Sequence, residues 1–183
     1  IHISAVMLQL DNFYKARFVL SKVIRKTELV HTPRINPESD VYLKPECLQK
    51  TGSFKIRGAY YKISQLTDEE KAKGVIACSA GNHAQGVAFS AAKLKCKATI
   101  VVPETTPTIK IEAIKRFGGQ YVEVVQHGGS YTDAYNHALI LEKKHQLTFA
   151  HPFDDPDVIA GQGTVGLEML EAEPTRPRLI SYA

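Results

Sequence analysis

The feature that most restricts the fold of this chain is a regular alternation of short apolar runs and amphipathic stretches between residues 74 and 152. The apolar runs read GVIACSA (74–80), ATIVVP (98–103), YVEVVQ (121–126) and LTFAHP (147–152). Between them lie stretches with helical spacing, HAQGVAFSAAKL (83–94), PTIKIEAIKRFG (107–118) and YTDAYNHALILEKKH (131–145). Short runs rich in valine and isoleucine are typical of parallel strands buried on both faces. The segment therefore predicts an α/β fold, with an open and mostly parallel sheet and flanking helices.

The residues before this segment predict a more helical region. Three elements are expected there: a helix over 11–24, a short strand over 40–46 and a helix over 53–66. Asp11 or Asn12 is the expected N-cap of the first helix and Ser53 that of the second, because a side-chain oxygen there can accept from a free amide. Thr67 followed by Glu70 has the spacing of a capping box and predicts another helix start.

Composition limits the classes of function. The chain has 183 residues, of which 44% are hydrophobic and 23% charged, and its net charge is +4. These values are ordinary for a globular protein of one domain or two small lobes. Basic residues do not cluster with aromatic ones, which argues against nucleic-acid binding. No apolar run approaches the roughly 20 residues that cross a membrane, and the first residues lack the pattern of a signal peptide.

The cysteines and histidines predict no metal centre. Cys47, Cys78 and Cys96 are odd in number and form no CxxC pair. This pattern favours a reducing, cytoplasmic setting and argues against a structural zinc site. Four histidines have no metal-ligand spacing and are expected to be structural or solvated: His127, His137, His145 and His151.

The segment CSAGNHAQG (78–86) joins an expected strand to an expected helix. Ligands of open α/β sheets bind at the carboxyl ends of the strands, and a helix N-terminus offers free N–H groups to an anion. Neither familiar phosphate fingerprint fits, because no lysine follows Gly86 and no second glycine follows closely after Gly81. The alternative is a plain strand–helix turn whose helix is capped by Asn82. His83 is expected to cap or support this turn rather than to transfer protons.

Lys55 lies in TGSFKIRGAY (51–60), two residues after the expected N-cap, and has two interpretations. It is either an exposed lysine on the first turn of a helix or a buried nucleophile. A nucleophilic lysine must be neutral, and deprotonation at pH 7 from a reference pKa near 10.4 costs about 4.6 kcal/mol. Burial beside Phe54 and Ile56 disfavours the ammonium form, and so does the positive end of the helix.

Three segments together resemble a known family. KTGSFKIRGAY (50–60), SAGNHAQG (79–86) and HPFDDPDVIAGQGTVGLEML (151–170) are similar to the pyridoxal-phosphate enzymes of fold type II, the tryptophan-synthase-β type. Within that group the chain looks most like threonine dehydratase, with serine racemase as a near relative. The similarity runs from about residue 11 to about residue 171. The lysine segment and the asparagine loop are specific as a pair, which favours the nucleophile interpretation of the lysine.

The resemblance implies a cofactor and roles for particular residues. Pyridoxal 5'-phosphate would form a Schiff base with Lys55, Phe54 would pack beside the cofactor ring, and Asn82 would hydrogen-bond the ring hydroxyl. The substrate carboxylate would be held, largely through backbone N–H groups, by the loop of Ser79, Ala80, Gly81, Asn82 and His83.

The resemblance also implies a domain organisation. Residues 1–73 would be the N-terminal part of a large domain, residues 74–151 a complete small α/β domain, and residues 152–183 a return to the large domain. The family's glycine-rich phosphate loop would lie further along the chain than residue 183, so a C-terminal truncation is expected. A homo-oligomer, either a dimer or a tetramer, is the expected assembly.

The implied reaction is deamination of L-threonine, and also of L-serine, by β-elimination to 2-oxobutanoate or pyruvate and ammonia. Ala80 stands where serine racemases carry a serine, and a methyl group cannot transfer a proton, so elimination is favoured over racemisation. Serine racemase-like activity remains an alternative, and so does a catalytically silent fragment. A plain nucleotide-binding module is disfavoured by the two failed phosphate fingerprints.

Overall fold

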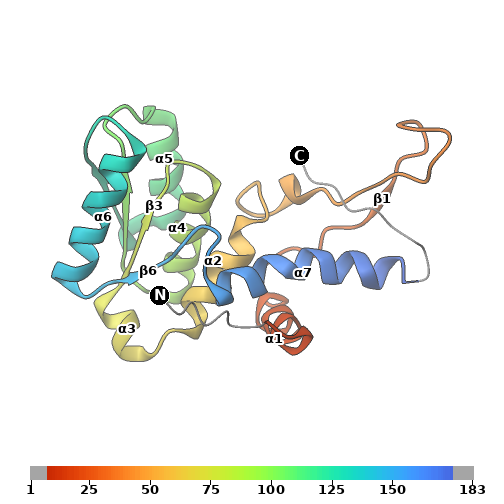
Figure 1. Cartoon of the computed structure of the whole chain (residues 1–183), viewed down its shortest axis with the longest axis horizontal. Helices are drawn as coiled ribbons and strands as arrows, with labels where there is room; N and C mark the ends of the chain where they lie inside the picture. The colour runs from red at the N-terminus through yellow and green to blue at the C-terminus, as the bar shows by residue number, and fades with distance from the viewer. Residues whose placement is uncertain (1–7, 175–183) are drawn as a thin grey trace, which may run out of the picture.

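The computed structural model describes residues 8–174, which form two regions (Figure 1). The helices are α1 (Leu10–Leu20), α2 (Lys55–Gln65), α3 (Asp68–Lys73), α4 (Asn82–Leu94), α5 (Thr108–Gly118), α6 (Tyr131–His145) and α7 (Pro156–Ala172), with short 3-10 helices η1 (Glu46–Leu48) and η2 (Gly119–Tyr121). The strands are β1 (Val30–His31), β2 (Tyr42–Leu43), β3 (Val75–Cys78), β4 (Ala98–Val102), β5 (Val122–Gln126) and β6 (Thr148–Phe149). We call residues 74–151 the sheet lobe, and residues 8–73 with 152–174 the helical region.

The sheet lobe is built on four parallel strands in the order β5-β4-β3-β6. In register, Ile76 of β3 lies opposite Thr99, and Ile100 of β4 lies opposite Val124. Each strand is joined to the next by one of the helices α4, α5 and α6, which is the alternation that the sequence predicts. The expected α/β class, with an open parallel sheet and flanking helices, is confirmed.

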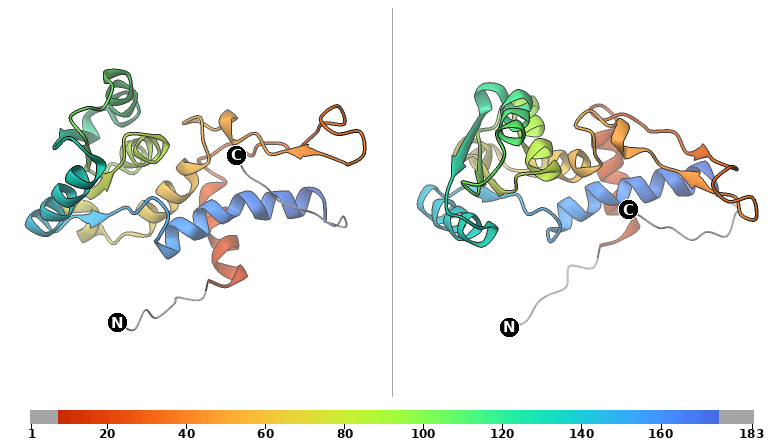
Figure 2. Two further views of the ribbon diagram at one scale, coloured as in Figure 1. Left: turned by 45° about the horizontal axis from the view of Figure 1, so that its top comes forward. Right: turned by 90° about the horizontal axis from the view of Figure 1, so that it is seen from above.

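Apolar side chains bury both faces of the two central strands. One cluster packs Ile100 and its neighbours in β3 and β4 against α2, α4 and α5. A smaller cluster on the other face packs Ile76 and Val101 against α6, and Figure 2 shows α4 and α6 on opposite sides of the sheet. The edge strands β5 and β6 are only half-buried, so the prediction of strands buried on both faces is wrong at both edges, where each strand has one partner strand among residues 8–174.

Two predicted helix starts are confirmed by their caps. The side chains of Thr67 and Glu70 form the expected capping box ahead of α3. α6 spans the predicted residues 131–145, and a capping box of Ser130 and Asp133 fixes its first turn. In both places a local hydrogen-bonding pattern decides where the helix begins, so the sequence is sufficient to locate it.

Every predicted strand is shorter in the structure, and two of them have only two residues. The strand predicted over 147–152 spans only Thr148–Phe149, because the chain turns at His151, whose ring accepts from the amides of the second and third residues after it. The strand predicted over 40–46 spans Tyr42–Leu43 and pairs antiparallel with Val30–His31, a partner that the sequence analysis did not propose.

The ends of α1 also differ from prediction. The helix spans Leu10–Leu20 rather than 11–24, and its N-cap is Gln9. Asn12 takes part in this cap from the third helical position, where its side-chain oxygen accepts from the Gln9 amide at 2.9 Å. The prediction that Asp11 or Asn12 is the N-cap is therefore wrong.

α7 crosses α2 at glycines. A Cβ on Gly161 would lie 2.7 Å from the carbonyl oxygen of Arg57 and 2.7 Å from the Cα of Gly58, so the two helices touch backbone to backbone. α1 packs on both helices through a small apolar cluster of Ala16, Leu20, Tyr61 and Ala160. The three helices thus form the body of the helical region, from which β1 and β2 extend as an arm (Figure 1).

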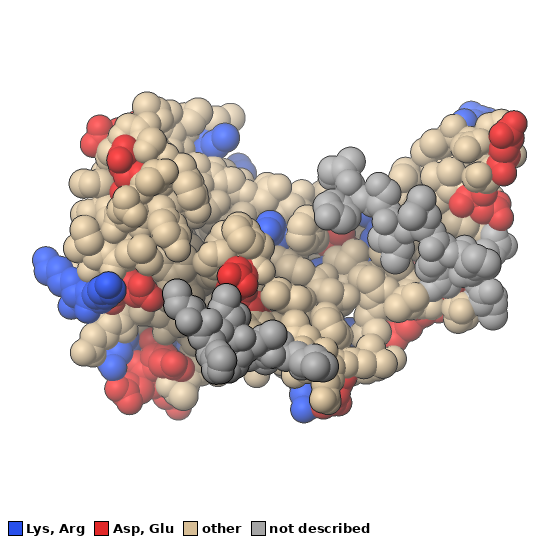
Figure 3. All heavy atoms as spheres, in the orientation of Figure 1, with Lys and Arg blue, Asp and Glu red and all other residues tan. Residues whose placement is uncertain are grey.

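The surface carries charges of both signs. On the face drawn in Figure 3, basic and acidic side chains gather in small separate groups with uncharged surface between them. Among residues 8–174, no helix is long and apolar enough to cross a membrane. Within the same part of the chain, no three side chains of His, Cys, Asp or Glu come together as a metal site would require.

Candidate active site

Lys55 is the first residue of α2, and its amine lies at the carboxyl end of the sheet lobe, beyond β6. The side chain is half-buried. Its Nζ donates to the Pro152 carbonyl oxygen at 2.7 Å and lies 5.4 Å from the centre of the Phe54 ring. Burial lowers the pKa of Lys55, which makes the neutral, nucleophilic amine easier to reach. The interpretation of Lys55 as an exposed surface lysine is therefore wrong.

The residues ahead of Lys55 correct a predicted cap. Phe54, not Ser53, is the N-cap of α2, and no side chain caps this helix. The hydroxyls of Ser53 and Thr51 are buried without a hydrogen-bond partner among the described residues. Phe54 leaves 42% of its surface exposed beside the amine. Buried polar groups without partners carry a cost, so these hydroxyls mark a place where a bound polar group would be stabilised.

The loop at residues 79–83 leads from β3 into α4. The Gly81 amide donates to the Ser79 hydroxyl at 3.2 Å, which folds the loop back on itself. Gly81 is the N-cap of α4, and Asn82 is its first helical residue, with no side-chain capping bond. The alternative of a helix capped by Asn82 is therefore wrong. The first amides of α4 remain available to an acceptor outside the helix.

His83 is buried and points away from solvent toward the end of β6. Its Nε2 lies 2.8 Å from the carbonyl oxygen of Ala150, while Nδ1 has no hydrogen-bond partner among residues 8–174. Burial lowers the pKa of His83 to about 4; the hydrogen bond to Ala150 opposes this shift, and the charge of Lys55 adds to it. The ring is neutral at pH 7, and its contact with Ala150 ties the first turn of α4 to the end of β6; the supporting role expected for His83 stays a prediction.

A glycine contact brings the loop and the lysine together. A Cβ on Gly86, in α4, would lie 3.1 Å from the carbonyl carbon and oxygen of Lys55 and 3.2 Å from the amide of Ile56. Only a glycine lets α4 approach the first turn of α2 this closely without a shift of the backbone. Two sequence segments that are separate in the chain thereby meet at one end of the sheet.

Arg57, two residues after Lys55, is fully buried, although no local sequence pattern indicates a role for it. Its guanidinium donates two hydrogen bonds to Glu46 of η1 and two to Glu168 of α7, all between 2.8 and 3.0 Å. Lys44 also pairs with Glu168. We call these four side chains the Arg57 network. Because it joins η1, α2 and α7, it fixes the helix that carries the candidate lysine.

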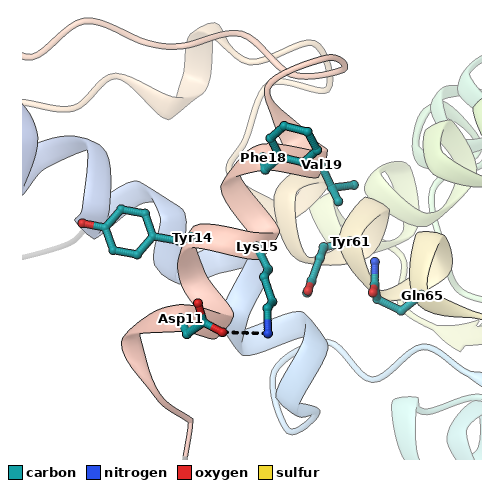
Figure 4. A pocket seen from close by; sticks show the side chains of 7 residues that line it. All are labelled: Asp11, Tyr14, Lys15, Phe18, Val19, Tyr61 and Gln65. Atoms are coloured by element: carbon teal, nitrogen blue, oxygen red, sulfur yellow. Dashed lines mark ion pairs between the residues drawn. The ribbon is translucent and has the colours of Figure 1, made fainter.

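A surface hollow lies away from these residues. A volume of about 450 Å³ opens between α1 and α2, and Figure 4 shows side chains of both helices around it. It is lined by Asp11, Tyr14, Lys15, Phe18, Val19, Tyr61 and Gln65. None of the predicted site residues lines this hollow, so the candidate active site is defined here by the chemistry and proximity of its residues.

Fold and site together define an α/β protein that presents a half-buried lysine beside the amide-rich start of a helix. Residues 20–183 match the family described as pyridoxal-phosphate dependent enzyme, and the chain belongs to that family. The expected family, its fold type and its cofactor class are confirmed by this match and by the relatives below.

The relatives point to one group within the family. The chain is 58% identical over 130 residues to the biosynthetic L-threonine dehydratase of Burkholderia multivorans. This alignment covers 71% of this chain and 26% of that protein. Threonine deaminase isoform 2 of Solanum lycopersicum has a TM-score of 0.80 and 41% identity, over 90% of this chain and 46% of its own. Maize serine racemase has a TM-score of 0.85 and 32% identity, over 91% and 50%. The chain thus spans half or less of each of these proteins.

The residues around Lys55 fit the family's cofactor. The amine can condense with an aldehyde, and Phe54 offers an exposed aromatic face beside it. The Asn82 side chain is exposed and makes no hydrogen bond to another residue in the range 8–174, so it is free to bind a polar substituent. The orphaned hydroxyls of Thr51 and Ser53 are further polar groups at this end of α2.

Proposed function

We propose that this chain is the lysine-bearing portion of a pyridoxal-phosphate dependent threonine dehydratase that deaminates L-threonine, and also L-serine, by β-elimination. One observation carries the proposal: in a chain 58% identical over 130 residues to a threonine dehydratase, the half-buried Lys55 amine is near enough for its charge to lower the pKa of His83, and the Lys55 backbone meets α4 at Gly86. In this proposal residues 74–151 are a small domain, and the rest belongs to a large one.

Lys55, Phe54 and Asn82 would hold the cofactor. When bound, pyridoxal phosphate supplies an electron-accepting ring next to the substrate's Cα. The protein's own contribution is proton transfer at Lys55 Nζ. Because burial lowers the pKa of Lys55, its neutral amine can accept the α-proton of the amino acid as a general base. The substrate then loses its β-hydroxyl, and hydrolysis yields the 2-oxo acid and ammonia.

The loop would bind the substrate carboxylate. The first amides of α4 have no acceptor inside the helix, and the positive end of the helix dipole lies at the same point. The His83 ring contributes indirectly, because its hydrogen bond to Ala150 fixes the start of α4. Binding by the backbone holds the carboxylate in place and leaves the β-carbon free to react.

Ala80 supports elimination rather than racemisation. Racemisation needs a second acid–base group on the substrate face opposite the lysine, and a methyl side chain has no proton to give. Serine racemase-like turnover is therefore disfavoured despite the similar fold of maize serine racemase. Measuring D-serine released from L-serine, alongside pyruvate, separates the two reactions.

A catalytically silent chain is the second candidate, because the chain covers 26% and 46% of two relatives. The test is a titration with pyridoxal phosphate, followed by borohydride trapping and mass spectrometry of the Lys55 peptide. A trapped adduct at Lys55, with 2-oxobutanoate formed from threonine, supports the dehydratase. No adduct at any cofactor concentration favours the silent chain.

Replacing Lys55 with alanine tests its role directly. Loss of a general base lowers turnover by a factor on the order of 10²–10⁴, and the trapped adduct should disappear. Lys110→Ala is the matched control, because Lys110 is an exposed lysine on α5 away from the site. Full activity in an active preparation of Lys55→Ala would show that the assignment is wrong.

A further inference from the structure

The segment from Ala150 to Asp155 runs from β6 into α7 past the start of α2 (Figure 1). Its Pro152 carbonyl oxygen accepts from Lys55 Nζ at 2.7 Å, and this is the hydrogen bond found for the amine among residues 8–174. A carbonyl oxygen can only accept, so it takes one N–H of the amine and sets the direction of the lone pair. The position of this carbonyl therefore controls how Lys55 presents its nucleophile.

A histidine holds the turn that contains this carbonyl. His151 Nδ1 accepts from the amide of Asp154 at 2.7 Å and from the amide of Phe153 at 3.3 Å. The two bonds enclose the peptide of Pro152 within the turn. An imidazole nitrogen that accepts a hydrogen bond carries no proton itself, so Nδ1 acts here purely as an acceptor.

The rest of the segment is fixed at both ends. Before the turn, the Ala150 amide donates to β3 and its carbonyl lies 2.8 Å from His83 Nε2. After the turn, the Asp155 carboxylate caps α7 and pairs with Lys62 of α2 at 2.8 Å. The turn between these anchors depends on His151 for its side-chain hydrogen bonds.

We propose that His151 is a positioning residue for Lys55: its Nδ1 closes the turn at residues 151–154 and so holds the Pro152 carbonyl against the lysine amine. The catalytic meaning of this arrangement rests on the proposed function. The arrangement itself is a property of the protein alone and can be tested without cofactor.

The chain provides a template for a conservative replacement. Asp155 uses one carboxylate oxygen to accept from the amides of residues 157 and 158, at 2.9 and 3.1 Å. This is the pattern that His151 Nδ1 makes with the second and third residues after it. An asparagine oxygen at 151 can make the same bonds, as in Asx turns. His151→Asn thus keeps the acceptor without the ring.

His151→Phe is the complementary variant, because it keeps the ring and removes the acceptor. It keeps an aromatic ring against Phe149 and Phe153, whose centroids lie 6.2 and 4.6 Å from that of His151, but it has no acceptor. If the ring only fills space, the phenylalanine variant behaves as the wild type does. If the hydrogen-bond acceptor positions the turn, the asparagine variant behaves as the wild type does and the phenylalanine variant does not.

The measurement is competitive acylation of the full chain with trace acetic anhydride, read as the ratio of labelling at Lys55 to labelling at the exposed Lys110. The Pro152 acceptor favours the protonated amine, so its loss leaves more neutral amine and faster labelling. We expect the ratio at pH 7 to rise about tenfold in His151→Phe and to stay within about twofold of wild type in His151→Asn, the scale of one hydrogen bond.

An unchanged ratio in His151→Phe would overturn the proposal, and so would an asparagine variant that matches the phenylalanine variant. Lys110 normalises the amount of reagent, and Lys44, whose side chain is only 5% exposed, reports general unfolding, because its labelling relative to Lys110 should stay low in every variant. Failure of pyridoxal phosphate to link to Lys55 would overturn the proposed function and leave this measurement unaffected.

Discussion

The sheet lobe and the helical region bury their interiors by different chemistry. In the sheet lobe, β3 and β4 are covered by apolar side chains from both faces. The helical region has a much smaller apolar cluster, and its centre is the Arg57 network, two basic and two acidic side chains between η1, α2 and α7. The candidate lysine lies on the helix that both regions share, since α2 packs against α4 and α7.

This difference separates stability from positioning. Apolar burial is non-directional and tolerates small shifts, whereas a buried ionic network adds little net stability but fixes one geometry. We expect the network to fix how α2 is rotated about its own axis and where it sits along α7. The hypothesis that it exists for that specificity is testable, because breaking it and replacing it should have different costs.

The largest expected effect is loss of Arg57. Arg57→Met leaves Glu168 with only Lys44 and leaves Glu46 without its buried cation, which should lower the free energy of unfolding by about 3–5 kcal/mol. The sheet-lobe control Ile100→Val removes one methylene from an apolar core and should cost about 0.5–1.5 kcal/mol. Urea denaturation of both variants gives the comparison.

A double variant distinguishes a network that adds net stability to the fold from one that only fixes the geometry of α2. Arg57→Met combined with Glu168→Leu removes one charge of each sign and supplies apolar volume, so it should be more stable than Arg57→Met alone. If the double variant is the less stable of the two, the network contributes stability outright, and the contrast with the sheet lobe disappears.

The same contrast decides what the sequence could predict. α6 and the sheet were predictable because their signals are local: apolar spacing, and caps such as Ser130 with Asp133. The burial of Arg57 was not predictable, because arginine is usually exposed and its buried partner Glu168 lies 111 residues further along the chain. α7 escaped a helix prediction because it contains glycines whose role is close packing, as at Gly161.

The candidate site was predictable in part for similar reasons. Lys55 and Asn82 lie in short segments that resemble a family, so their residue types carried the signal. The contact with Pro152 was not visible, because any residue supplies a backbone carbonyl and only the fold aims it. Ser53 misled because a serine before a helix usually caps it, whereas here its hydroxyl is buried without a partner among the described residues.

The two regions should also differ in the pH range over which each loses stability. Burial lowers the pKa of His83, in the sheet lobe, from 6.5 to about 4. Between these values the unfolded chain binds a proton that the folded chain does not, so stability is full above pH 6.5 and falls as the pH drops toward 4. The loss should approach about 3 kcal/mol, at 1.36 kcal/mol per pKa unit.

Glu168, in the helical region, acts at lower pH. Burial would raise the pKa of its carboxyl, but the hydrogen bonds from Arg57 and Lys44 outweigh burial and lower it. A carboxyl with a depressed pKa stabilises the fold above its unfolded pKa and loses this contribution as the pH falls through the folded value. Unfolding free energies from pH 8 to pH 3 should therefore show two steps, and His83→Asn should remove the first. A single step unaffected by His83→Asn would contradict the assignment.

The smallest expected effects compare two glycines on α7. A Cβ at Gly161 would lie 2.7 Å from the Arg57 carbonyl oxygen, whereas a Cβ at Gly166 meets nothing within 4 Å. Gly161→Ala should therefore force α2 and α7 apart and cost about 1–3 kcal/mol. Gly166→Ala should stabilise the helix by about 0.5–1 kcal/mol, because alanine loses less backbone entropy than glycine on folding.

The pair also reports on the site. α2 carries Lys55 at its start, so a shift of α2 against α7 should alter the acylation of Lys55 in Gly161→Ala and leave it unchanged in Gly166→Ala. Thermal unfolding measures the stability of both variants, and labelling relative to Lys110 measures the site. If Gly161→Ala destabilises the chain but labels Lys55 as the wild type does, the crossing of the two helices supports the fold without positioning the lysine.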